Sequence, residues 1–225
     1  MVSKTLILAA AGLATAGPLC GRAPFPPMNT AEAFTLIANV TDTAKAASLF
    51  PDIDIQGLRI NAIQLSEGHN PLFLNPVTRN VFFVNGTAAD VSAGATSIAI
   101  PPREHNGRFL PQGLQFTAGA TPGLLEVGSN IGFPHTGAGI RGGLRSPYPT
   151  AFAPASGTFV ACVNEPLIPR AVKFATGTVP ENCVAINLLA QCSELTLPNA
   201  GPVLNLSPVP VSCYKDVSAI DWSKY

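Results

Sequence analysis

Two short segments of the chain place a glutamate close to a histidine. The segment "SEGHN" contains Glu67 and His69, and "PREHNGR" contains Glu104 and His105. Neutral histidine is the usual general base and a frequent metal ligand, and its charge state responds to a neighbouring carboxylate. These four residues are the candidates for hydrolytic chemistry, although each segment also has the composition of an ordinary polar loop.

Paired carboxylates would be needed for the hydrolysis of a glycoside. Besides the two glutamates above, the acidic candidates are Asp52, Asp54 and Glu126. Asp52 and Asp54 would share one face of a strand, but "FPDIDIQG" is more typical of a solvated loop. A serine triad is not indicated, because the chain has no G-x-S-x-G sequence.

A glycine motif, Gly137 to Gly142 in "HTGAGIRGG", matches the G-x-G-x-x-G pattern of dinucleotide-binding loops. That loop needs a strand before it and a helix after it, because the helix N-terminus binds the pyrophosphate. Pro134 interrupts the preceding segment, and three prolines in "LRSPYPTAFAPASG" prevent the helix. We therefore expect no nucleotide cofactor and a long glycine-rich loop, with Arg141 and Arg145 in solvent.

Five cysteines, Cys20, Cys162, Cys183, Cys192 and Cys213, would form two disulfides with one left over in an oxidising compartment. The clustering favours a bridge among Cys162, Cys183 and Cys192, but the pairing stays open. No C-x-x-C pair occurs, and His69, His105 and His135 are scattered, so we expect no metal site.

The N-terminal segment has the pattern of a secretory signal peptide. Lys4 precedes an apolar run from Leu6 to Ala16, and Ala14 and Ala16 suit a signal peptidase, which predicts cleavage after residue 16. Three acceptor sequences for N-glycans begin at Asn39, Asn85 and Asn205. These features predict a secreted glycoprotein, extracellular or associated with the cell wall.

Composition excludes several classes of partner. Thirteen basic and 13 acidic residues balance without a long run of one sign, which argues against nucleic acid. No second apolar segment is long enough to span a membrane. With 47% hydrophobic and only 12% charged residues, the chain can build a core, and we expect a monomer.

Many short β-prone runs separated by proline and glycine predict an all-β fold, a sandwich or barrel, with the β-sandwich or jelly roll preferred. In "AFTLIANVT", Phe34, Leu36, Ala38 and Val40 alternate with polar or outward positions that include Asn39. Further runs are "LRINAIQL", "TSIAI", "GLQFT", "GLLEV", "TFVACVN", "RAVKFAT" and "CVAINLL". In "NVFFVNGTAADV", Asn85-Gly86 predicts a two-residue hairpin turn.

Helix is expected only at "DTAKAASLF", where Asp42 or Thr43 could cap the N-terminus. The predicted layout is a signal peptide over residues 1–16, a proline-rich arm over 17–29, one β-sandwich domain over 30–193, and an irregular, proline-rich extended tail over 194–225. Cys213 is positioned to attach that tail to the domain.

The segments "FTLIANV", "VFFVNGTAADV", "LPQGLQF" and especially "TFVACVNEPLIPRAVKFATGTVPENCVAINLLAQC" resemble a family of small secreted fungal proteins of unknown function. Some members of that family are labelled IgE-binding or antigen-like. The resemblance covers residues 33–192 and implies a secreted, β-rich, disulfide-bonded protein without catalytic residues to transfer. The tail, Cys20 and Cys213 depart from the family pattern.

The leading functional hypothesis is a non-catalytic secreted protein that recognises a cell-wall glycan or a host protein. The alternatives are a glycan-active hydrolase using Glu67, His69, Glu104 and His105, and a carbohydrate-binding module. Sugar-binding modules usually expose aromatic platforms, yet the chain has one tryptophan, Trp222, and three tyrosines. An exposed row that includes Tyr148 would favour the module.

Overall fold

The computed structural model describes residues 26–65, 70–77, 80–105, 108–131, 135–141, 148–163, 168–197 and 206–221, with the backbone only at 103–105, 108–111 and 130–131. Cys20, the signal segment, Asn205 and Trp222 lie outside these residues. Expectations that depend on them therefore remain predictions.

The described chain is mostly β-structure, as the sequence predicts. In chain order its elements are β1 (Asn29–Ala31), β2 (Ala33–Val40), α1 (Thr43–Leu49), β3 (Arg59–Ala62), β4 (Leu72–Asn75), β5 (Phe83–Asn85), α2 (Ala88–Ala93), β6 (Ser97–His105), β7 (Arg108–Ala118), β8 (Leu124–Ile131), β9 (Gly139–Arg141), β10 (Thr150–Phe152), β11 (Thr158–Cys162), β12 (Ala171–Ala175), β13 (Cys183–Ser193), β14 (Pro208–Val209) and β15 (Val211–Cys213).

Six antiparallel strands form a closed ring in the order β2, β3, β4, β12, β11 and β13. The ring closes because β11 pairs with β12 along one edge and with β13 along the other. The result is a barrel-like closed sheet, and the preferred β-sandwich or jelly roll is not confirmed.

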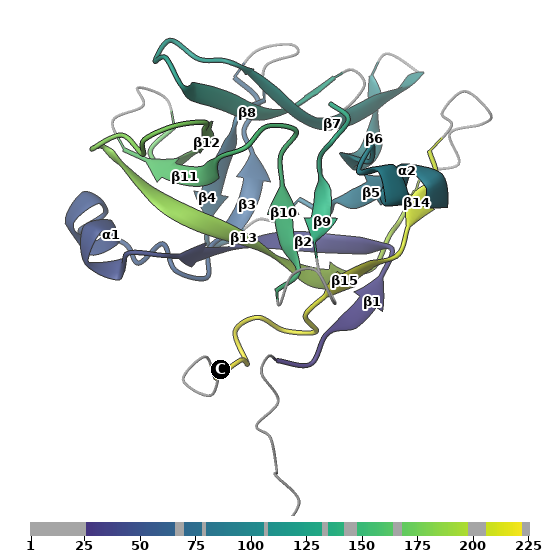
Figure 1. Ribbon diagram of the computed structural model, residues 1–225, viewed down its shortest axis with the longest axis horizontal. Coiled ribbons are helices and arrows are strands. Elements are labelled where there is room, and N and C mark those ends of the chain that lie inside the picture. The colour runs from purple at the N-terminus through teal and green to yellow at the C-terminus, as the bar shows by residue number, and fades with distance from the viewer. Residues whose placement is uncertain are drawn as a thin grey trace, which may run out of the picture.

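A second set of strands, β8, β7, β6 and β5, continues from β12 and curves back toward β2. Phe82, just before β5, exchanges two backbone hydrogen bonds with Phe34 of β2, at 2.9 and 2.8 Å. Figure 1 shows β7 and β8 across the top of the molecule, β2 and β13 beneath them, and α1 and α2 at opposite sides.

The alternation predicted for β2 is confirmed on its inner face. Phe34, Leu36, Ala38 and Val40 are buried in the main hydrophobic cluster inside the closed sheet. Burial of apolar surface is the dominant stabilising term, so these side chains fix which face of β2 points inward.

The predicted hairpin turn at Asn85-Gly86 is wrong. β5 and β6 do pair, but helix α2 lies between them. Thr87 caps this helix by accepting a hydrogen bond from the Asp90 backbone N–H, and the Asp90 carboxylate accepts one from the Thr87 N–H. This reciprocal capping box satisfies two N–H groups that the first helical turn leaves free, and it starts a helix where the dipeptide suggested a tight turn.

Two disulfides join strands of the fold. Cys162 of β11 is bonded to Cys183 of β13, and these two residues also face each other in the strand register. Cys192, near the end of β13, is bonded to Cys213 of β15. The structure thus pairs two of the three clustered cysteines with each other and the third with the C-terminal segment.

The C-terminal segment, residues 206–221, contains strands where the sequence predicts an irregular tail. β14 pairs with β5, and β15 pairs with β1 in a separate two-stranded sheet. Tyr214 and Val217 pack with Ile37 of β2 and Leu189 of β13 in a buried cluster. The outer face of β2 is therefore buried as well, because the C-terminal segment covers it.

Candidate functional site: a pocket beneath helix α1

Helix α1 begins where the sequence predicts it. The Asp42 side chain accepts a hydrogen bond from the Lys45 N–H at 2.9 Å, which caps the first turn. Lys45 Nζ donates to the Pro180 carbonyl oxygen at 3.3 Å and links the helix to the segment before β13. The first turn of α1 is thus attached to the segment before β13, and Ala46 and Phe50 bury the inner face of the helix in the main hydrophobic cluster.

A loop returns the chain from α1 to β3. Phe50 and Ile55, 6% and 1% exposed, are its two buried side chains and join the main hydrophobic cluster. Gly57 has a φ of 77°, a left-handed conformation that favours glycine. Its N–H donates to the Ala38 carbonyl at 2.9 Å, so the loop ends against β2.

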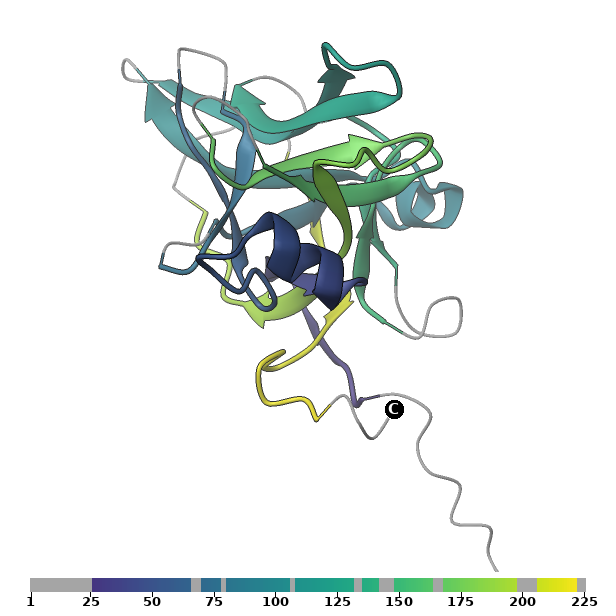
Figure 2. The same cartoon turned by 90° about the vertical axis from the view of Figure 1, so that its left-hand side faces the viewer.

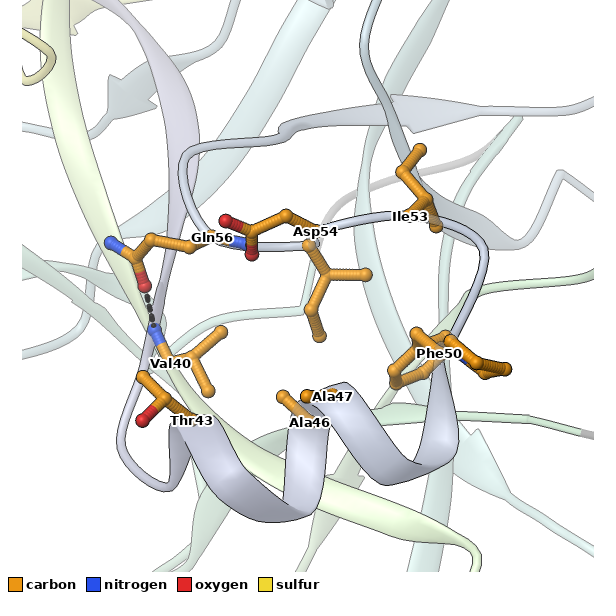
Figure 3. A pocket seen from close by; sticks show the side chains of 10 residues that line it. Val40, Thr43, Ala46, Ala47, Phe50, Ile53, Asp54 and Gln56 are labelled. Carbon is orange, nitrogen blue, oxygen red and sulfur yellow. Dashed lines mark hydrogen bonds between the residues drawn. The ribbon is translucent and has the colours of Figure 1, made fainter.

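A pocket of about 480 Å³ lies between α1 and this loop. Its volume falls within the range of small-molecule sites. Figure 3 shows Ala46 and Ala47 on the helix, with Val40, Phe50 and Ile53 around the space. In Figure 2, α1 and the loop that follows it are turned toward the viewer. The small alanine side chains leave room that a larger residue would fill.

One wall of the pocket is polar and fixed in place. Gln56 Oε1 accepts a hydrogen bond from the Val40 N–H at 2.7 Å, and Gln56 Nε2 donates to Asn39 Oδ1 at 3.1 Å. The Asp54 carboxylate accepts from the Gln56 N–H at 2.9 Å. The wall therefore offers an ordered amide and one carboxylate beside apolar surface.

The lining of this pocket contains few groups that ionise. Among the described residues that line it, Asp54 is the single carboxylate, and neither histidine nor cysteine is present. Acid–base cleavage of a glycoside needs two carboxyl groups. A ligand with an apolar body and one hydrogen-bonding group would match the walls of this pocket.

None of the four candidate catalytic residues is among the described residues that line the pocket. Glu67 and His69 lie outside the described residues. Glu104 and His105 end strand β6, where their backbone faces Phe109 and Arg108 of β7. The hypothesis that these four residues act together stays a prediction.

The other acidic candidates lie in the loop after α1 and on strand β8. Asp52 and Asp54 are exposed in the loop after α1, as expected for a solvated segment. Glu126 of β8 forms an ion pair of 2.9 Å with Lys173 of β12, whose side chain is only 7% exposed. Sequence reasoning missed this pair, because the two residues meet only through the register of β8 and β12.

An exposed aromatic row, which would favour a sugar-binding module, does not occur in the described part of the chain. Tyr148 is half-buried and packs against the cluster of Ile37, Leu189, Tyr214 and Val217. The large hydrophobic side chains exposed within the described ranges are Val77 and Val91.

The glycine motif forms a strand in its centre, so the predicted long loop is wrong for residues 139–141. Gly139–Arg141 is β9, which pairs with β10. Gly139 cannot carry a side chain without disturbance, because a Cβ there would lie 2.7 Å from Thr96 Oγ1. Arg141 is exposed, as expected, and its guanidinium lies 4.7 Å from the centre of the Phe152 ring. Arg145 lies outside the described residues.

Two predicted glycan acceptors lie within the described chain. Asn39 and Asn85 are both half-buried, and the side-chain oxygen of each accepts a hydrogen bond, from Gln56 Nε2 and from the Ser207 N–H respectively. The described helices include none long and apolar enough to cross a membrane. Within the same residues, histidine, cysteine and acidic side chains form no cluster able to hold a metal ion.

The fold and pocket define a mostly β, disulfide-bonded protein with a ligand-sized pocket that has apolar walls and one polar wall. The chain belongs to the family described as a domain of unknown function, DUF7907, which matches residues 31–192. It is 29% identical to "Antigenic protein SchS34" of Stachybotrys chartarum over 93% of this chain and 99% of that protein. No solved structure is a significant match.

These matches agree with the sequence resemblance to fungal proteins of unknown function with antigen-like labels. The α1 pocket, residues 40–56, lies inside the family match. The sequence signal that could have found it is the alanine-rich helix "TAKAASL" followed by "FPDIDIQG", although neither segment shows by itself that a cavity separates them.

Proposed function

We propose that this protein is a secreted, non-catalytic recognition protein that binds a small apolar molecule in the α1 pocket. The observation that carries the proposal is the pocket of about 480 Å³ with apolar walls and a fixed Gln56 amide. Asp54 and Thr43 supply further polar groups at its lining. The cell-wall or host partner predicted from the sequence would then be a molecule that carries or releases such a ligand.

The two disulfides and the antigenic relative support a location outside the cell, since disulfides persist in oxidising compartments. We expect the protein in culture medium to begin at Gly17 and to carry N-glycans at one or more of Asn39, Asn85 and Asn205. N-terminal sequencing and intact-mass measurement before and after glycosidase treatment check both points. A mature chain that retains Met1 would contradict the secretion hypothesis.

Binding of a neutral apolar fluorophore tests the pocket. We expect N-phenyl-1-naphthylamine to bind saturably with increased fluorescence. Ala46→Phe should weaken this binding by about tenfold or more, because the new ring occupies the space that the ligand needs. Ala46 is 6% exposed and lines the cavity.

The matched control is Ala44→Phe on the same helix. Ala44 is exposed and is not among the pocket residues, so this variant should bind the fluorophore as the unsubstituted protein does. Thermal unfolding of both variants establishes that they are folded. Unsaturable binding, or equal affinity in the Ala46→Phe and Ala44→Phe variants, would reject the pocket as the ligand site.

A further inference from the structure

A second pocket, of about 300 Å³, lies between β3 and the C-terminal segment. Its apolar lining consists of Ile37, Val217 and Ile220, and its polar lining includes Arg59 and Gln191. The C-terminal segment is fixed at this position by the Cys192–Cys213 disulfide. The barrel therefore forms one side of the pocket, and the C-terminal segment forms the other side.

Arg59 has an unusual environment within this pocket. Its backbone lies in β3, where it faces Ile37 of β2 on one side and Asn75 of β4 on the other. Its Nε atom is buried and has no hydrogen-bond partner within the described part of the chain. A buried charged donor without an acceptor is costly, so an acceptor that reached Arg59 would be bound favourably.

Asp216, the acidic residue of the same pocket, does not fill that role. Its Oδ1 accepts hydrogen bonds from Ser218 N–H at 2.9 Å and from Ser218 Oγ at 2.7 Å. These bonds hold the pKa of the Asp216 carboxyl below its ordinary value, with a weaker contribution from the charge of Arg59. Among the described residues, Asp216 is exposed and makes no ion pair within 4.0 Å of Arg59.

Gln191 presents a second donor to the pocket. Its Oε1 accepts a hydrogen bond from the Val217 N–H at 2.9 Å, which fixes the orientation of the amide. The NH₂ end of Gln191 is the other hydrogen-bonding group of this side chain, and Gln191 and Arg59 both line the pocket. The pocket thus combines two hydrogen-bond donors with three aliphatic side chains. A matching ligand would have an anionic group that accepts hydrogen bonds and a short hydrocarbon chain.

We propose that this pocket binds a small carboxylic acid with an apolar body, its carboxylate on Arg59 and Gln191 and its hydrocarbon on Ile37, Val217 and Ile220. The planar guanidinium can donate two parallel hydrogen bonds to one carboxylate. This site is distinct from the α1 pocket. Gln56 lines both, but its side-chain amide is held by Val40 and Asn39.

Titration of the full-length mature protein with hexanoate, hexan-1-ol and inorganic phosphate tests the proposal, by calorimetry at low ionic strength and pH 7. We expect hexanoate to bind saturably, and the neutral alcohol and phosphate each to bind at least about tenfold more weakly. Equal affinity for hexanoate and the alcohol would overturn the role of the charge. Equal affinity for hexanoate and phosphate would overturn the role of the apolar lining.

Three variants assign the site. Arg59→Met should weaken hexanoate binding by about tenfold or more, because both hydrogen bonds and the charge are lost. Asp216→Asn should strengthen it by about two- to threefold, since it removes a nearby negative charge. Arg141→Met, at an exposed arginine of β9 that is not among the residues lining this pocket, is the control and should change nothing.

The Asp216→Asn variant keeps the test decisive if Arg59→Met does not fold, since it leaves Arg59 in place and predicts a gain. Unchanged hexanoate affinity in Asp216→Asn or in a folded Arg59→Met protein would reject the assignment. Ala46→Phe should not alter hexanoate binding, and Arg59→Met should not alter binding of the fluorophore. A failure at one pocket is therefore separable from a failure at the other.

Discussion

Replacing Cys192 and Cys213 together by alanine is expected to lower the free energy of unfolding by about 3 kcal/mol. The two cysteines are 21 residues apart, and their bond limits the conformations of the unfolded chain. In the folded state the same bond holds Tyr214 and Val217 over Ile37 and Leu189. Denaturant unfolding measures the stability. Limited proteolysis with mass spectrometry should detect release of residues 206–221 well before the barrel is digested.

The matched control is the double alanine variant of Cys162 and Cys183, a bond with the same separation of 21 residues. Its stability should fall by a similar amount, about 3 kcal/mol, because the loop has the same length. The C-terminal segment should remain resistant to protease, since its own disulfide is intact. If both variants lose the C-terminal segment equally, the Cys192–Cys213 bond is not what attaches it.

Glu126→Gln is the second substitution with a large expected effect, a loss of about 2 kcal/mol in the free energy of unfolding. It removes the carboxylate from the buried Lys173 ammonium, which cannot recover full hydration at 7% exposure. The reverse change, Lys173→Met, should cost less, because the Glu126 side chain is 32% exposed and can be hydrated.

The double variant, Lys173→Met with Glu126→Gln, completes the cycle. Replacing both charges by groups of similar shape should recover most of the stability lost in Glu126→Gln, since no buried charge remains. Urea denaturation of the four proteins measures the coupling. A double variant as unstable as Glu126→Gln alone would show that the ion pair does not account for the loss.

The sequence predicted those parts of the fold that depend on local pattern. The alternation of Phe34 to Val40 identified the inner face of β2, and Asp42 identified the start of α1. The hairpin at Asn85-Gly86 failed because the Thr87 to Asp90 capping box starts a helix there. The sequence contains both signals, a turn dipeptide and the spacing of a capping box, and in the folded chain the capping box prevails.

The parts that could not be predicted depend on distant contacts. Pro208 pairs with Asn85, and β11 pairs with both β12 and β13, and no local periodicity encodes either arrangement. The cysteine pairing depends in the same way on strand register. The second pocket forms where the C-terminal segment crosses the barrel, so its lining residues, from Ile37 to Ile220, are far apart along the chain. The α1 pocket is lined by residues 40–56 alone, but the space between the helix and the loop after it depends on how both pack against the barrel.

Closure of the sheet also affects the tendency of the protein to aggregate through its strand edges. An exposed strand edge offers unpaired N–H and C=O groups onto which a foreign strand can add, as in amyloid growth. In the described part of the chain the sheet path ends at β9 and β14, which have three and two residues. Edges this short give little length for templated addition, so we expect edge-to-edge aggregation not to start at β9 or β14.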